Sequence, residues 1–208
     1  MNFNFRRVIV LPLLLTCALT GALSAASRIS LHDPRYKQLA SGEILFADVV
    51  EESDNGIEAT FLLHNSAEQL WRILTDYENY DRNFENIEKI KIIEENSGGA
   101  VLELWISTVI KTFHYKVYRH HVKQHHKLTW RMISGDFKTN HGSWEMFETS
   151  DPNTSLIKYR CFVEIEGFMG QAFKSLTRPE TLKRINRMVV KLKTQLEPVI
   201  ASGKRNMT

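Results

Sequence analysis

The chain has 208 residues, of which 43% are hydrophobic and 25% are charged, and its formal net charge is +3 at pH 7. This is the composition of an ordinary globular protein, and it excludes a low-complexity chain. Arg6 and Arg7 carry most of the excess positive charge, so the composition of the rest does not support nucleic-acid binding.

The N-terminal segment predicts a secretory signal peptide. Two arginines precede an apolar run over residues 8–23, and small residues follow it. Ser24 and Ala26 occupy the positions of a small-residue cleavage site, so we expect cleavage near Ala26 and a secreted or periplasmic protein. Lipidation at Cys17 and a retained membrane anchor remain open as alternatives.

Cys161 is the cysteine that remains after removal of residues 1–26, so the mature chain cannot form an internal disulfide. An exported domain without disulfides must be held together by its hydrophobic core. This favours a bacterial periplasm over a disulfide-rich secreted module.

The first elements after the signal are an arm and a hairpin. Residues 27–42 are predicted to be irregular, and β-rich runs follow at 42–52 and 55–65. Asn55-Gly56 is a strong signal for the hairpin turn between these runs.

Two short helices are predicted next. Ser66 and Gln69 form the pattern of a capping box, which predicts a helix that starts at Ser66. The segment 76–87 has aromatic residues at helical spacing, which indicates a short helical continuation or turn.

A series of β-strands follows, and period-two alternation is visible in several of them. The predicted strands span 87–95, 100–110, 113–122, 128–134, 142–149 and 156–166. In the last strand, apolar residues such as Ile157 and Tyr159 share one face and charged residues share the other. One face of the predicted antiparallel sheet is therefore dry and must be covered.

The chain ends in a long amphipathic helix. It is predicted to start at Ser175 or Thr177, with Pro179 in its first turn. Its apolar stripe comprises Leu182, Ile185, Val189, Leu192, Leu196 and Val199. Its basic residues, Lys183, Arg184, Arg187, Lys191 and Lys193, are interpreted as a solvated surface or, alternatively, as a site of transient attraction to anionic lipid head groups.

These elements predict an α+β fold in which a curved antiparallel β-sheet wraps around a long C-terminal helix, with two short helices after the first strands. A sheet that grips a helix often leaves a cavity between them, and such cavities suit apolar ligands.

At this point the chain resembles the START-like helix-grip superfamily, also called SRPBCC, and its polyketide cyclase and coenzyme-Q-binding branch. The resemblance is carried by 66–95, which includes Trp71, Asp76 and Tyr77, by 128–148, by 154–164 and by the C-terminal helix. Within 128–148, Gly135, Phe137, Gly142 and Trp144 match a Gly-Asx-Phe…Gly-x-Trp signature. The resemblance covers 43–200, between an arm at 27–42 and a tail at 201–208.

The resemblance implies a hydrophobic cavity for a lipid, quinone or similar apolar molecule, without a cofactor or a metal. We expect the cavity to be lined by Tyr115, Trp130, Met132, Trp144, Tyr159, Phe168, Ile185, Val189 and Leu192. A binding or transport protein is favoured over an enzyme. A cyclase or dehydratase that uses Glu103 or His121, and an interaction module without a usable cavity, are the alternatives; the oligomeric state stays open.

The stretch 119–127 holds four of the chain's eight histidines. Between two adjacent strands it becomes a hairpin end, which puts His120 and His121 on opposite sides and is interpreted as a solvated polar turn. A metal site and a pH-responsive loop are the alternatives.

Glu103 and Arg119 are candidates for a polar pair in the cavity, although strand parity favours an outward Glu103. Cys161, on an apolar face, is interpreted as a small hydrophobe and not as a nucleophile.

Overall fold

The computed structural model describes residues 34–108, 111–165 and 168–196, apart from the side chains of 34 and 168–177. The predicted signal peptide and the tail at 201–208 lie outside these residues. The helices are α1 (Pro34–Ala40), α2 (Ala67–Thr75), the 3-10 helix η1 (Tyr77–Asn79), α3 (Tyr80–Asn83) and α4 (Phe168–Leu196). The strands are β1 (Leu45–Glu51), β2 (Asp54–Leu63), β3 (Ile87–Asn96), β4 (Gly99–Ser107), β5 (Thr112–Lys123), β6 (Lys127–Gly135), β7 (Thr139–Glu148) and β8 (Ser155–Glu164).

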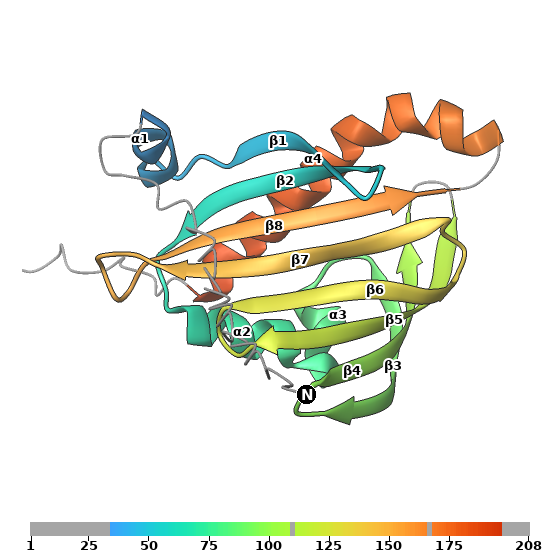
Figure 1. Ribbon diagram of the computed structural model, residues 1–208, viewed down its shortest axis with the longest axis horizontal. Coiled ribbons are helices and arrows are strands. Elements are labelled where there is room, and N and C mark those ends of the chain that lie inside the picture. The colour runs from blue at the N-terminus through green and yellow to red at the C-terminus, as the bar shows by residue number, and fades with distance from the viewer. Residues whose placement is uncertain (1–33, 109–110, 166–167, 197–208) are drawn as a thin grey trace, which may run out of the picture.

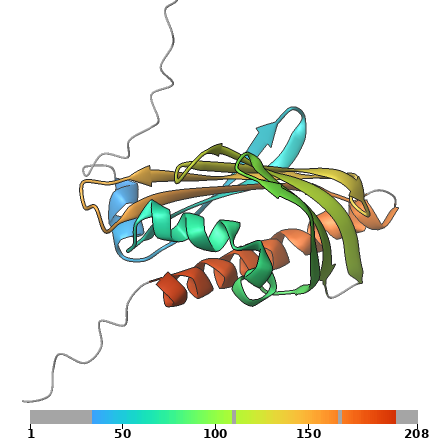
Figure 2. The ribbon, with the colours of Figure 1, turned by 90° about the horizontal axis from the view of Figure 1, so that it is seen from below.

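The strands form one eight-stranded antiparallel sheet in the order β1-β2-β8-β7-β6-β5-β4-β3 (Figure 1). The sheet curves around α4, and α2 and α3 lie on the same side of it (Figure 2). We call this side the inner face. The predicted helix-grip fold is therefore confirmed.

The alternation of residue types in the strands determines which side chains reach the core. In β5, Phe113, Tyr115 and Val117 are buried, whereas Thr112 and His114 are exposed. The inner-face residues of the strands join apolar residues of α2, α3 and α4 in one hydrophobic cluster, which is the main core. Burial of this apolar surface is the principal source of stability.

A smaller cluster lies on the opposite, outer face. Leu39 of α1 packs there against Leu62 of β2 and Leu156 of β8. The segment predicted as an irregular arm thus contains the helix α1, which packs on one end of the outer face.

The capping prediction for α2 is confirmed. Ser66 is the N-cap residue, and its hydroxyl accepts a hydrogen bond from the backbone N–H of Gln69 at 3.3 Å. The neighbouring Asn65 is buried and donates through its side chain to the backbone carbonyl of Leu196, while its own carbonyl accepts from Ser155 Oγ at 2.9 Å. Asn65 thereby joins the end of α4, the start of β8 and the start of α2.

The prediction of the first hairpin turn was wrong by three residues. The turn consists of Glu52 and Ser53, whose φ angles are +48° and +79°, and Asn55 and Gly56 lie within β2. Gly56 is needed for packing, because a Cβ at this position would lie 2.4 Å from Cδ1 of Phe162. Gly56 therefore does not form the turn. It is required because β2 approaches β8 closely at this position.

The predicted start of the last helix was also wrong. α4 begins at Phe168, and Pro179 lies inside it. A proline removes one backbone hydrogen bond and bends a helix, but packing on both sides can keep the helix continuous. Next to Pro179, Arg178 forms an exposed ion pair with Asp48 of β1 at 2.8 Å, so this part of the helix lies close to the sheet. Among the described residues, no helix is long and apolar enough to cross a membrane.

Candidate functional site

A buried arginine lies on the inner face of β5. Arg119 follows Tyr115 and Val117 on the buried side of β5, and its exposed fraction is 6%. Its Nε and Nη2 atoms are buried and have no hydrogen-bond partner among the described residues. A buried donor without an acceptor costs free energy, so this arrangement needs an explanation.

Aromatic rings surround the guanidinium group. Its central carbon lies 5.2 Å from the ring centroid of Tyr80 in α3 and 5.6 Å from that of Trp130 in β6. Cation–π contacts of this kind stabilise the positive charge through the ring faces. They do not accept hydrogen bonds from the N–H groups in the guanidinium plane, so the two donors remain unsatisfied.

Arg119 is a permanent positive charge. Burial alone lowers its pKa, but the neighbouring hydroxyl groups of Tyr80, Tyr77 and Tyr115 act in the opposite direction, and the net shift of its pKa is upward. No described carboxylate forms an ion pair with Arg119. The site is therefore cationic at every physiological pH.

The tyrosines around Arg119 are neutral. Burial raises the pKa of Tyr77 to about 12, and it also raises the pKa values of Tyr80, Tyr115 and Tyr159. The Arg119 charge acts against this shift in each case, but burial outweighs it. These phenols can donate and accept hydrogen bonds, and they do not neutralise the arginine.

An apolar wall continues from the arginine along the sheet. The ring of Tyr159 in β8 lies between Trp130, at a centroid distance of 5.7 Å, and Trp144 of β7, at 4.6 Å. Trp130 donates from Nε1 to the buried Asn140 Oδ1 at 3.1 Å. This bond fixes the orientation of the indole ring beside Arg119.

His121 lies at the edge of the site, two residues after Arg119. Its Nδ1 is 3.3 Å from the carbonyl oxygen of Ser97, which can only accept, so Nδ1 carries the proton in the neutral ring. Its Nε2 is 2.9 Å from the hydroxyl group of Tyr77 and therefore accepts from it. Trp71 of α2 packs edge-on against His121 and also against His125.

The predicted hairpin at 119–127 is confirmed, but its description as a solvated turn was incomplete. β5 ends at Lys123 and β6 begins at Lys127. His120 is exposed and stacks on Tyr118, whereas His121 and His125 contact Trp71. No group of three metal-ligating side chains occurs in the part of the chain that the structure describes.

Most of the residues predicted to line a cavity come together. Tyr115, Trp130, Trp144, Ile185, Val189 and Leu192 are buried in the main core, and Met132 and Tyr159 pack against it. The side chain of Phe168 lies outside the described residues. The structure thus places eight of the predicted residues in one cluster, and their contact with a ligand stays a prediction.

Glu103 does not join Arg119. It lies on the outer face, where its Oε1 is 3.0 Å from Nε2 of His114. Cys161 lies beside the core as a free thiol, and burial raises its pKa, which disfavours a thiolate nucleophile.

Sequence reasoning did not identify Tyr80 or Asn140 as parts of the site. Tyr80 belongs to a segment that was predicted only as a helical continuation, and the spacing of Tyr77, Tyr80 and Phe84 was the available signal. Asn140 was assigned to a loop because β7 was predicted to start at Gly142. The strand starts at Thr139, which turns Asn140 to the inner face.

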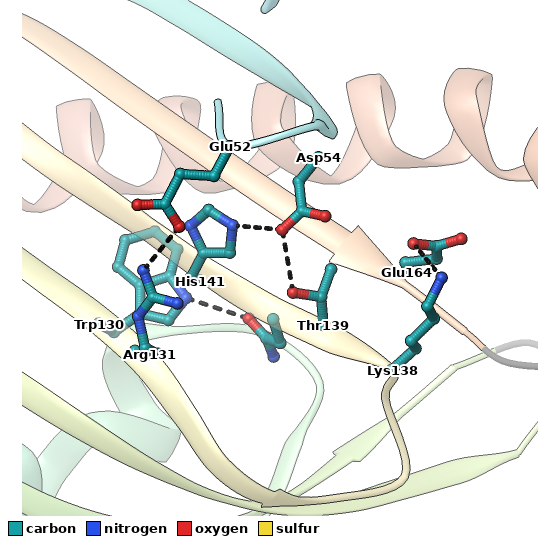
Figure 3. A network of polar contacts seen from close by, with 9 residues as sticks. Glu52, Asp54, Trp130, Arg131, Lys138, Thr139, His141 and Glu164 are labelled. Atoms are coloured by element: carbon teal, nitrogen blue, oxygen red, sulfur yellow. Dashed lines mark hydrogen bonds and ion pairs between the residues drawn. The ribbon is translucent and has the colours of Figure 1, made fainter. Parts of the chain in front are cut away.

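A second polar cluster lies on the outer face, beneath the first hairpin (Figure 3). Asp54 Oδ2 is 2.9 Å from Nε2 of His141 and accepts from the hydroxyl group of Thr139 at 3.2 Å. His141 is buried and stacks on Phe162 at a centroid distance of 4.6 Å. This cluster fastens the hairpin to β7, and it is separated from Arg119 by the sheet.

The chain matches a family of known proteins. The family described as "Polyketide cyclase / dehydrase and lipid transport" matches residues 63–189. This range runs from the end of β2 into α4 and contains Arg119 and the aromatic residues around it, whereas Leu192 lies just beyond it. A sequence search of curated proteins gives no match.

Several solved structures share the fold. A protein from Thermus thermophilus is 11% identical, with a TM-score of 0.60 over 67% of this chain and 95% of that one. A START superfamily protein from Mycobacterium smegmatis is 16% identical, with a TM-score of 0.58 over 68% and 97% of the two chains. The Zhui aromatase/cyclase from Streptomyces is 18% identical, with a TM-score of 0.53 over 72% and 90%. At these identities the likeness concerns the fold.

Proposed function

Because the chain belongs to the polyketide cyclase / dehydrase and lipid transport family, we propose that it binds a hydrophobic small molecule, such as a lipid or a quinone, between the inner face of the sheet and α4. Burial of apolar ligand surface would supply the binding energy, at about 25 cal/mol per Å² before the costs of association. The Trp130, Tyr159 and Trp144 rings would provide the complementary apolar wall.

The observation that carries this proposal is the buried Arg119 with two donors that no described protein group satisfies. A hydrophobic core that served only stability would gain from an apolar residue at this position. A polar group held by aromatic rings in an apolar region is instead typical of ligand sites, which combine an apolar lining with a few orienting polar groups.

Binding is favoured over catalysis by the positions of the acid–base candidates. Glu103 lies on the outer face. His121 lies at the edge of the site, and burial lowers its pKa, but its ring nitrogens are engaged by Tyr77 and Ser97. No aspartate or glutamate is among the buried polar residues of the part of the chain that the structure describes. A cyclase or dehydratase reaction would therefore have to rely on Arg119 and neutral tyrosines.

The place of action proposed here is the periplasm, on the basis of the signal-like segment at residues 1–26. N-terminal sequencing of the protein recovered from a periplasmic fraction tests this. A new N-terminus near Ser27 supports export with cleavage, and recovery of intact protein from the cytoplasm alone contradicts it.

Membrane contact through α4 would use the basic residues of the helix. Arg187 forms ion pairs with Glu85 and Glu180, and Lys193 donates to the carbonyl oxygen of Gly42. These side chains serve the fold itself, so attraction to anionic lipids would rest on the remaining basic residues of the helix. Co-sedimentation with anionic and with neutral vesicles tests this contact. Binding to anionic vesicles alone supports attraction to lipid head groups, and binding to neither contradicts it.

The first test of the proposed function is native mass spectrometry of the protein purified from its expression host, followed by organic extraction and identification of the extract. A stoichiometric apolar adduct supports the proposal. An unshifted mass after incubation with a broad lipid extract contradicts it.

Two neighbouring residues of β6 provide a matched pair for this test. Met132 packs on the inner-face core, whereas Ile133 is 56% exposed. Met132→Trp is expected to reduce the adduct because the larger ring occupies ligand space. Ile133→Trp is expected to leave the adduct unchanged.

A further inference from the structure

The two unsatisfied atoms of Arg119 form one edge of its guanidinium group. The Nε–H bond and one Nη2–H bond are nearly parallel and lie in the same plane, because the guanidinium group is rigid and planar. Their spacing matches the two oxygens of a carboxylate or of a phosphate group, which this edge binds through two parallel hydrogen bonds. The pattern of unsatisfied atoms therefore selects an oxyanion over a single carbonyl oxygen.

The electrostatics of the site point to the same chemistry. Arg119 keeps its charge, the surrounding tyrosines are neutral, and no described carboxylate pairs with it. A neutral ligand would leave this buried charge uncompensated, which is costly at low dielectric. A singly charged anion would neutralise the site and satisfy both donors.

The surroundings of the arginine also fix where an apolar tail would lie. Tyr80 and Trp130 contact the guanidinium group, and Trp130 continues into the wall formed by Tyr159 and Trp144. These residues belong to the same cluster as Val189 and Leu192 of α4. An anionic head at Arg119 would thus place its tail between the sheet and α4.

We propose that the ligand is an anionic amphiphile whose carboxylate or phosphate group is bound side-on by Nε and Nη2 of Arg119. This inference rests on the proposed function and names the chemical class of its ligand. It predicts discrimination between ligands that share an apolar tail and differ in head-group charge.

The test uses the protein expressed from the full sequence, stripped of lipid and loaded with the neutral dye Nile red. Displacement of the dye is measured with oleic acid and with methyl oleate at pH 8.5, where a carboxyl group is ionised. A second pair, dioleoyl phosphatidic acid and dioleoylglycerol, tests the phosphate source. The charged member of at least one pair is expected to bind about ten-fold to a hundred-fold more tightly than its neutral partner.

Variants connect the discrimination to the arginine. Arg119→Gln retains a polar side chain but removes the charge. Arg119→Met replaces the arginine with an apolar side chain. Both are expected to bind the charged and neutral ligands equally. Arg131→Gln is the matched control, because Arg131 is on β6, its side chain is 67% exposed and it pairs with Glu52 on the outer face. It is expected to discriminate like the wild type.

The outcomes separate this inference from the proposed function. Equal affinity of the wild type for charged and neutral ligands overturns the inference and leaves the proposed function standing. Discrimination that persists in both Arg119 variants, with circular dichroism showing that they are folded, overturns it as well. Failure of every ligand and of the dye to bind the folded wild type overturns the proposed function itself. The pair with the larger ratio of charged to neutral affinity identifies the oxyanion as carboxylate or phosphate.

Discussion

The indole ring of Trp130 in β6 lies directly against the backbone of Gly142 in β7. A Cβ atom at Gly142 would be 2.4 Å from Cζ2 of Trp130 and 2.2 Å from the carbonyl oxygen of Arg160. The glycine thus leaves room for the indole ring beside Arg119. Gly142 belongs to the signature on which the family resemblance was based, and this contact gives the signature residue a physical reason.

Gly142→Ala is expected to lower the free energy of unfolding by about 1–3 kcal/mol, because the added methyl group must displace the indole ring or the strand. Urea denaturation measures this difference. Gly98→Ala is the control, because a Cβ at Gly98 meets only the side-chain oxygen of Asn96, at 3.2 Å. Equal stability of the two variants would contradict the packing role of Gly142.

Arg119→Met is expected to raise the free energy of unfolding of the lipid-free protein by about 1–3 kcal/mol, because it removes a buried charge without an ion-pair partner. Thermal and urea unfolding of delipidated wild type and variant measure the effect. Arg131→Met, at an exposed site, should change stability by less than about 0.5 kcal/mol. A large loss of stability in Arg119→Met would show that the arginine holds the fold together.

His121 should make stability depend on pH below neutrality. Burial lowers its pKa in the folded protein, so the unfolded chain binds a proton more readily. The stability associated with the neutral ring is complete above the ordinary value of 6.5 and is lost as the pH falls below it. Melting temperatures between pH 8 and pH 5 should therefore fall less in His121→Gln than in the wild type. His120→Gln, an exposed neighbour, should follow the wild type; an identical profile for all three proteins would contradict the expectation.

Asp54 should contribute stability that acid removes. Its hydrogen bond with His141 holds its pKa below the ordinary value of 3.8, and the contribution is therefore complete above pH 3.8 and lost as the pH falls through the lowered pKa. At pH 7, Asp54→Ala should cost about 1–2 kcal/mol, because it leaves the buried His141 without this partner. Glu52→Ala, in the exposed turn of the same hairpin, should cost less than about 0.5 kcal/mol. A difference between wild type and Asp54→Ala that is unchanged at pH 3 would refute the assignment.

The strands and the first cap could be predicted because local chemistry decides them. Period-two alternation identified β3 to β8 to within a few residues at most ends, and Ser66 marked the start of α2. The start of α4 and the position of the first turn could not be predicted. Pro179 and Gly56 interrupt a helix or a strand only where tertiary packing does not override their local preference.

The centre of the site was only partly predictable. The parity of Phe113, Tyr115 and Val117 extends to Arg119, and this supports an inward arginine. The alternation of side chains along β5 cannot show that the guanidinium group lacks a hydrogen-bond acceptor. The residues around it come from α3, β6 and β8, which are distant in sequence. The position of Asn140 depended on where β7 begins, and strand ends are the least certain part of a sequence pattern.

The order of strands in the sheet also determines when the molecule can be completed. β2 pairs with β8, so that Phe61 lies opposite Ile157, and no other strand joins the first hairpin to the rest of the sheet within the described residues. During synthesis the first hairpin emerges long before β8. Until β8 is made, the backbone groups along one edge of β2 have no strand to pair with. A chain that is halted before β8 keeps an open, apolar edge that can pair with another copy. We therefore expect synthesis of the C-terminal third to close this edge and to lower the tendency of the nascent chain to aggregate.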